Sequence, residues 1–268
     1  MLKITALPHN VDIESLKNGY CFVSLPKPDA VQQTITGMRD YFDQPPTVKL
    51  GDRRPAIDEW GYRPMPEPKE LFMVRNAMLP PPLVQATQVW RQCHSLVETA
   101  LGAVAGHLGL PAMALVDLAD PRPNLAAVPS ASVLRLLYYH PRQQGLAAEE
   151  HEDLGLLSYL PSSTQPALQI LDYRDLAWHD IERPAKDAGI LMVGRSLELL
   201  SRGRFPACCH RVMSTPVARY SLVYQARIRA NAQIDSDVFG LSGYPPLIRG
   251  DDFFDRIRLP LKSVNGTY

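Results

Sequence analysis

The sequence predicts a mainly β domain with a helical N-terminal region, and three observations point to this fold class. Apolar residues recur at helical spacing in the first half of the chain, whereas short β-like runs follow one another from residue 132 onward. The 25 prolines gather in clusters between these segments, as is typical of turns and loops. Short strands separated by turns favour a sandwich or a barrel.

In chain order, two helices come first. We predict them over residues 28–42 and 83–108, where the apolar residues have helical spacing. The intervening residues 51–75 are polar, contain proline, and include the aromatic residues Trp60 and Tyr62 without a clear period. We expect this segment to form a long loop or short strands that could reach an active site.

Six strands are predicted in the second half, at residues 133–139, 154–160, 167–171, 189–193, 208–213 and 219–227. A short helix or turn is expected at residues 197–200, and a final helix at residues 251–259. We therefore predict one domain over residues 1–268. It would comprise a largely helical scaffold (1–125), a β core (126–230) and a C-terminal tail (231–268) that packs on the core.

Composition excludes several classes of partner. Lysine plus arginine and aspartate plus glutamate number 28 each, so no general attraction to nucleic acid or to an anionic membrane is expected. The best apolar stretch, residues 101–118, is interrupted by His107 and Pro111, which favours a buried helix over a membrane span. No secretory pattern is recognised, so a cytoplasmic protein is expected. The four cysteines lack Cys-x-x-Cys spacing, which favours reduced thiols.

Two candidate ligands of one metal ion are only two residues apart. On an extended segment, His151 and Asp153 would point to the same face. His210 lies 57 residues after Asp153 in another predicted strand, a separation that allows a return to a neighbouring strand. Two histidines and one carboxylate form a facial triad that suits non-haem Fe(II) and leaves coordination positions open. The alternatives are a surface histidine at 151 and a hydrogen-bonded core histidine at 210.

A candidate carboxylate anchor follows in the last predicted strand. Arg219 and Ser221 occupy alternate positions, so their guanidinium and hydroxyl groups can point at the same ligand. Arginine is suited to recognising a carboxylate. Between residues 182 and 235 the only acidic residues are Asp187 and Glu198. A bound carboxylate is therefore the predicted partner of a buried Arg219.

These motifs resemble the isopenicillin N synthase-like family of Fe(II)- and 2-oxoglutarate-dependent dioxygenases. The resemblance runs from about residue 15 to residue 228. Besides the metal and anchor motifs it is carried by residues 19–22, 41–49, 61–62, 69–72, 135–141, 151–158, 167–170, Trp178, 189–194 and 201–204. It implies a distorted double-stranded β-helix, or jelly-roll core, with the helical N-terminal region packed on it.

The resemblance also implies the chemistry. The three candidate ligands would bind Fe(II), and Arg219 and Ser221 would bind the distal carboxylate of the co-substrate 2-oxoglutarate, with Tyr139 as a third contact. Tyr138, one residue out of phase, would pack against the helical scaffold. The implied reaction consumes O2, releases succinate and CO2, and hydroxylates, desaturates or cyclises a small molecule.

Two residues depart from the pattern of many plant members. Leu137 replaces an asparagine near the co-substrate, and Arg195 replaces an aspartate after the glycine turn. Two alternatives therefore stay open: an Fe(II) oxidase of the same fold that does not use 2-oxoglutarate, and a metal-binding protein without catalytic activity. Because Asp153 is present, where related halogenases have a small residue, halogenation is disfavoured.

Three residues are candidate substrate contacts. Arg75 and Arg195 could recognise an acidic group, and Tyr62 could line the pocket; a core or surface role is the alternative for each. At the level of the family, we expect an amino-acid-like molecule or another small natural product as the substrate.

Overall fold

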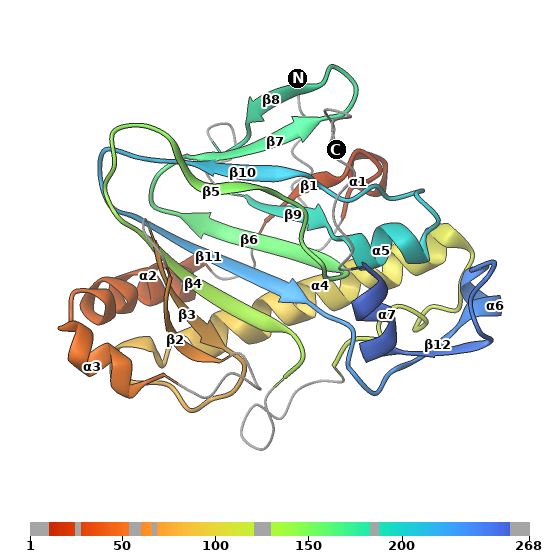
Figure 1. Ribbon diagram of the computed structural model, residues 1–268, viewed down its shortest axis with the longest axis horizontal. Helices are drawn as coiled ribbons and strands as arrows, with labels where there is room; N and C mark the ends of the chain where they lie inside the picture. Colours follow the sequence, from red (N-terminus) through yellow and green to blue (C-terminus); the bar gives the residue numbers. More distant parts are fainter. Residues whose placement is uncertain are drawn as a thin grey trace.

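The computed structural model describes residues 11–24, 28–53, 60–65, 69–120, 130–182 and 188–257, and within them two antiparallel sheets lie face to face (Figure 1). The larger sheet contains, in spatial order, β1 (Tyr20–Val23), β9 (Gly189–Val193), β6 (Leu157–Ser163), β11 (Arg219–Ala226), β4 (Val133–Tyr139), β3 (Lys69–Val74) and β2 (Gly61–Pro64). The smaller sheet contains β5 (Leu146–His151), β10 (His210–Met213), β7 (Leu168–Asp172) and β8 (Ala177–Asp180). The predicted mainly β jelly-roll core is confirmed.

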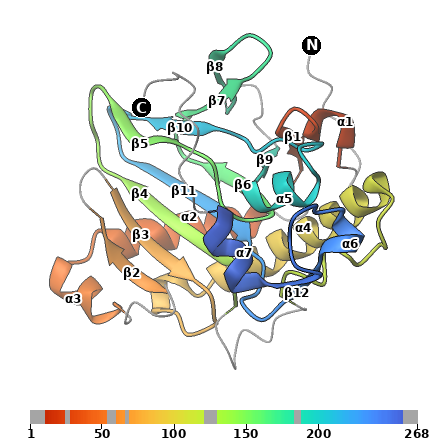
Figure 2. The same cartoon turned by 45° about the vertical axis from the view of Figure 1, so that its right-hand side comes forward.

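Helices cover the face of the larger sheet that is turned away from the smaller sheet, as Figures 1 and 2 show together. The main ones are α2 (Pro28–Phe42), which has the predicted bounds, and α4 (Ala86–Leu108). A 3-10 turn, η1 (Pro81–Leu83), precedes α4, which therefore begins later than predicted. α4 ends where Gly109 adopts a φ of 72°, a left-handed conformation that suits glycine. None of the described helices is long and apolar enough to cross a membrane.

Shorter elements complete the described chain. α1 (Ile13–Leu16) and α3 (Pro46–Gly51) flank the N-terminal region, and α5 (Arg195–Leu200) confirms the short helix expected near residue 197. Further on come β12 (Gln233–Asp235), α6 (Ser236–Phe239), β13 (Leu247–Arg249) and α7 (Gly250–Ile257). The last of these matches the predicted final helix as far as residue 257; residues 258–259 lie outside the described part.

Alternation along the strands creates two separate cores. On β4, Leu134 and Leu136 belong to the core beneath the helices, whereas Leu137 and Tyr139 belong to the core between the sheets. Tyr138 points to the helical side, where its ring stacks on Phe42 at a centroid distance of 5.5 Å, as predicted. The space between the two sheets is therefore lined by every second residue of β4.

The segment expected to be a long loop or short strands contains two short strands, β2 and β3, which extend the larger sheet. Other strands differ from the sequence expectation. β6 begins at Leu157 rather than at residue 154, because the backbone at Gly155 makes a tight turn against the carbonyl of Ala226. The strands β5 and β8 were not predicted from periodicity. β5 is rich in alanine and glutamate, which have low strand propensity, so pairing with β10 determines its conformation.

Candidate metal centre

The three predicted metal ligands lie together at one end of the smaller sheet. His151 is the last residue of β5 and pairs directly with His210, the first residue of β10. Asp153 follows two residues after His151 and is buried. One ligand atom from each of the three side chains lies within 4.8 Å of the other two. This is the donor set that suits non-haem Fe(II).

Backbone carbonyl groups orient both histidines. His151 Nδ1 lies 2.7 Å from the carbonyl oxygen of Glu149, and His210 Nδ1 lies 2.9 Å from that of Cys208. Because a carbonyl oxygen only accepts hydrogen bonds, Nδ1 is the protonated nitrogen of each neutral ring. The Nε2 lone pair of each histidine is thereby left available for a metal ion.

The carboxylate of Asp153 is held by two neighbouring side chains. Ser158 Oγ donates to Oδ2 at 2.6 Å, and Gln225 Nε2 donates to Oδ1. Burial works to raise the pKa of Asp153, but His210 and His151 outweigh it and the pKa lies below its ordinary value. Burial, followed by the proximity of His210, lowers the pKa of His151 to about 4. At neutral pH the site therefore presents a neutral imidazole and an anionic carboxylate, the forms that bind metal.

The turn after Asp153 is clamped onto the start of α5. The amide N–H of Arg195 donates to the carbonyl of Asp153 at 2.8 Å, and Ser196 Oγ donates to the carbonyl of Leu154 at 2.6 Å. A Cβ atom on Gly194 would overlap the carbonyl oxygen of Gly155. Glycine at 194 thus permits a backbone approach that fixes the position of Asp153.

The side chain of Arg195, a predicted substrate contact, lies beside the metal motif. Its Nε is 3.8 Å from Oε2 of Glu152, the residue between the first two ligands. Tyr173 donates its hydroxyl to the other oxygen of Glu152 at 3.1 Å. Glu152 is therefore held on the side of Tyr173 and Arg195 rather than among the ligands.

The three predicted co-substrate contacts also lie together, on the face of the larger sheet that is turned towards the smaller one. Arg219 pairs with Tyr139 in register, and its guanidinium carbon lies 5.1 Å from the centre of the Tyr139 ring. Ser221 follows on the same face of β11. Nη1 of Arg219 and Oγ of Ser221 are buried and have no hydrogen-bond partner among the described residues. Two such groups side by side fit the distal carboxylate of 2-oxoglutarate.

One premise about this anchor is corrected by the structure. A bound carboxylate was predicted to be the partner of Arg219 because few acidic residues lie near it in the sequence. The protein itself places one carboxylate beside Arg219, that of Glu182, with Nη2 and Oε1 2.9 Å apart; the predicted carboxylate ligand stays a prediction. Glu182 follows β8, a strand that periodicity did not reveal, so this contact between distant parts of the sequence was missed.

The other two predicted substrate contacts have partners in the protein. Tyr62 belongs to the core beneath the helices, and its hydroxyl donates to Glu70 at 2.5 Å, so it does not line the space between the sheets. Its burial there corrects the expectation that it lines a substrate pocket. Arg75, which follows β3, donates through Nε to the carbonyl of Ser130.

Periodicity could have identified two residues that were missed. Gln225 follows Arg219 and Ser221 at even spacing on β11, which places its side chain on the same face. Arg135 stands two residues before Leu137 on β4, and its buried Nε has no hydrogen-bond partner among the described residues. Both positions could have been predicted from the alternation of side chains along a strand, which also identified Arg219 and Ser221 as the anchor.

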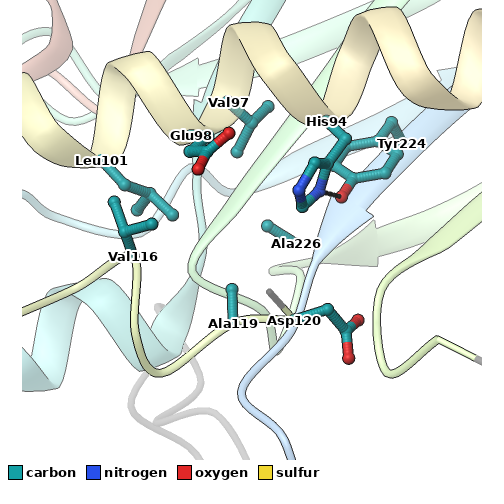
Figure 3. A pocket seen from close by; sticks show the side chains of 9 residues that line it. All are labelled: His94, Val97, Glu98, Leu101, Val116, Ala119, Asp120, Tyr224 and Ala226. Atoms are coloured by element: carbon teal, nitrogen blue, oxygen red, sulfur yellow. Dashed lines mark hydrogen bonds between the residues drawn. The ribbon is translucent and has the colours of Figure 1, made fainter. Parts of the chain in front are cut away.

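A small cavity lies on the opposite side of the larger sheet, between α4 and β11 (Figure 3). Its volume of about 10 Å³ suits a single water molecule. His94 and Tyr224 line it and share a hydrogen bond of 2.8 Å. The cavity is too small for an organic substrate and belongs to the packing of α4 on the sheet.

A second group of possible metal ligands lies in the turn between β7 and β8. Asp172, Asp175 and His179 lie close together there, and the last two are exposed. Arg174 pairs with Asp172, and His179 pairs with Asp175 at 2.8 Å. These contacts explain the group as surface ion pairs.

Comparison with known proteins supports the predicted family. Residues 130–228 match the model of the 2OG-Fe(II) oxygenase superfamily, so the family resemblance found in the sequence is confirmed for the β core. The chain is 30% identical over 115 residues to the 2-oxoglutarate-dependent dioxygenase frbH of Dothideomycetidae sp. (strain 11243), covering 40% of this chain and 35% of the relative. It is 33% identical over 103 residues to gibberellin 2-beta-dioxygenase 3 of Arabidopsis thaliana, covering 36% and 30%. The alignments thus span about a third of each relative.

Solved structures share the fold over nearly the whole chain. A Neurospora crassa protein solved in complex with alpha-KG and 5-formyluracil has a TM-score of 0.73 at 20% identity and covers 91% of this chain and 88% of its own. The rice dioxygenase for auxin oxidation has a TM-score of 0.69 at 22% identity and covers 91% and 86%. At these identities the likeness establishes the jelly-roll fold with its helical N-terminal region.

Proposed function

We propose that this protein, whose β core matches the 2OG-Fe(II) oxygenase superfamily, is an Fe(II)- and 2-oxoglutarate-dependent dioxygenase that oxidises a small molecule, by hydroxylation in the first instance. One observation carries the proposal. The three metal ligands lie together, and Gln225, which donates to Asp153, stands on the same face of β11 as Arg219 and Ser221. Nη1 of Arg219 and Oγ of Ser221 have no hydrogen-bond partner in the part of the chain that the structure describes. When bound, the iron and 2-oxoglutarate would supply the activation of O2, with release of succinate and CO2.

The chain's own part would be to hold and orient these groups. The two histidines would offer Nε2 atoms, and Asp153 would offer a negative charge fixed by Ser158 and Gln225. The apolar residues between the sheets would exclude water from the reacting groups; they include Leu160, Ile170 and Met192. Leu137, which pairs with Ser221, adds an apolar surface beside the anchor.

We further propose that the substrate carries an acidic group. Lys69 stands at even spacing from Leu71 and Met73 on β3, and Arg135 stands two residues before Leu137 on β4. Both cations therefore lie on the face of the sheet that carries these apolar residues. Burial lowers the pKa of Lys69, and the proximity of Arg135 lowers it further. Two cations on the same face of the paired strands favour an anionic ligand. Arg195, which lies beside Glu152 in the metal motif, is a candidate for a second contact.

The same-fold oxidase remains the second candidate function, because Glu182 already compensates the charge of Arg219. The catalytically inactive metal-binding protein is the third alternative. Nucleic acid and membranes are not expected as partners on the basis of composition, and the cytoplasmic location stays a prediction from the sequence.

The test is anaerobic titration of the Fe(II)-loaded protein with 2-oxoglutarate, followed by exposure to O2. We expect a saturable visible charge-transfer band from the keto acid and slow formation of succinate even without a primary substrate. The Ser221→Ala protein should bind 2-oxoglutarate more weakly while retaining its iron. Bound iron with neither a band nor succinate would favour the oxidase or the inactive protein.

A further inference from the structure

A buried ion pair connects the co-substrate anchor to the chain that follows β8. Glu182 Oε1 lies 2.9 Å from Arg219 Nη2, and the side chains of the two residues are only 7% and 1% exposed. Glu182 also accepts hydrogen bonds from Ser163 Oγ at 2.5 Å and from the amide N–H groups of Ala167 and Leu168 at 2.5 and 2.7 Å. Its carboxylate is therefore fixed by the protein independently of any ligand.

This pair determines which donors of Arg219 remain for a ligand. Nε donates to the carbonyl of Gln165 at 2.9 Å, and Nη2 is engaged by Glu182. Nη1 has no partner among the residues that the structure describes, and the same holds for Oγ of Ser221. A grip by Nη1 and Nη2 on one carboxylate would therefore have to share Nη2 with Glu182. The remaining donors, Nη1–H and the Ser221 hydroxyl, can each serve one oxygen of a ligand.

The pair also changes the electrostatics of the anchor. A guanidinium group attracts an incoming carboxylate strongly when both are buried. Here the fixed carboxylate of Glu182 already contacts the guanidinium through Nη2, and its repulsion opposes that attraction. Hydrogen bonds from Nη1 and Ser221 do not require the ligand to be charged. The anchor therefore relies on hydrogen bonds more than on net charge.

We propose that Glu182 is a specificity-determining residue of the co-substrate site: it holds Arg219 in place, cancels most of its charge, and so weakens the selection for a distal carboxylate. The proposal rests on the proposed function. The ligands that the anchor accepts are then 2-oxo acids whose distal end accepts hydrogen bonds. A negative charge at that distal end strengthens binding only modestly.

The test measures two dissociation constants for each protein, with full-length Fe(II)-loaded protein in the absence of O2. The ligands are 2-oxoglutarate and 2-oxopentanoate, which has a methyl group in place of the distal carboxylate. The readouts are the charge-transfer band and the shift of the unfolding temperature. Two hydrogen bonds alone would give the wild-type protein a preference for 2-oxoglutarate of up to about a hundredfold. Glu182→Gln, which removes the charge, should increase that preference by about tenfold or more.

Two further variants serve as controls. Glu182→Asp keeps the charge and should keep the wild-type ratio of the two constants. Asp180→Asn removes one negative charge from an exposed side chain two residues away that does not contact Arg219, and it should change neither constant. A purely structural role of Glu182 would weaken the binding of both ligands together and leave their ratio unchanged.

The outcomes separate this proposal from the proposed function. An unchanged or smaller ratio in Glu182→Gln, with normal wild-type binding, would overturn the role of Glu182 alone. If the wild-type protein prefers 2-oxoglutarate over 2-oxopentanoate by far more than a hundredfold, the role of Glu182 is also overturned. This outcome can be read even if the Glu182→Gln protein does not fold. Failure of the wild-type protein to bind either keto acid would contradict the proposed function and this proposal together.

Discussion

His151 and His210 are direct cross-strand partners in the smaller sheet, and their ring centres lie 4.3 Å apart. The pairing of β5 with β10 therefore brings together two imidazoles that are 59 positions apart in the sequence. Each ring is oriented by a carbonyl group of its own strand region, so the sheet sets both the spacing and the direction of the two nitrogen donors. The register of β5 against β10 thus determines the relative position of the two histidine ligands.

Replacing Asp153 with alanine should abolish tight Fe(II) binding, because it removes the anionic ligand of the triad. The fold should stay intact, because β5 and β10 remain paired without this side chain. We expect at least a hundredfold rise in the Fe(II) dissociation constant. The free energy of unfolding should fall by about 1–3 kcal/mol, since Ser158 and Gln225 lose their acceptor.

Glu152→Gln is the matched control for this change, because Glu152 is bonded to Tyr173 and lies outside the ligand set. It should retain iron at the wild-type affinity. Iron content after dialysis and an anaerobic chelator competition measure both proteins. Wild-type iron affinity in the Asp153→Ala protein would remove this residue from the triad.

Lowering the pH should destabilise the metal-free protein through His151. In the folded protein its pKa is about 4, against 6.5 for an ordinary histidine, so the unfolded chain binds more protons between these values. The free energy of unfolding therefore falls as the pH drops through this window, by up to about 3 kcal/mol for this group. Urea unfolding in the presence of a chelator, from pH 7.5 to 4.5, measures the slope. A His151→Asn protein should show a flatter dependence, and an equally steep one would assign the effect to other groups.

Much of the fold could be predicted because its core segments carry strong local signals. The apolar runs of β4 and β9 and the helical spacing of α2 gave the observed bounds. The anchor could be located because alternation along β11 links Arg219 and Ser221 irrespective of what surrounds them. Family landmarks supplied the jelly-roll topology, which periodicity alone left as a sandwich or a barrel.

Contacts between distant parts of the sequence account for what was missed. β5 has little strand propensity of its own and is extended because it pairs with β10. The partnership of Glu182 with Arg219 depends on how the chain returns after β8, which no local pattern encodes. Tyr62 looked like a pocket residue because of its aromatic character, yet its strand turns it towards Glu70 and the helices.

Placing a methyl group at position 194 should loosen the metal site more than it harms the rest of the fold. In Gly194→Ala the new Cβ would overlap the carbonyl of Gly155 and press on that of Asp153, so the turn must move away from α5. We expect a loss of about 1–3 kcal/mol in the free energy of unfolding. The affinity for Fe(II) should fall as well, because Arg195 N–H no longer holds the Asp153 carbonyl. Gly106→Ala is the control, since a Cβ on that α4 residue meets nothing within 4 Å and should be tolerated.

Gln225→Met should weaken metal binding by about 10- to 100-fold with little effect on the fold, because it preserves the size of the side chain and removes the amide that orients Asp153. The remaining Ser158 hydrogen bond holds only one carboxylate oxygen, so the other is free to rotate away from the position it needs. Gln169→Met on β7 is the matched control, since Gln169 bonds to Asp180 and Arg211 rather than to a metal ligand. Titration with Co(II), read from its visible spectrum, compares the two variants with the wild-type protein. Equal affinities for all three would mean that Ser158 alone positions the carboxylate.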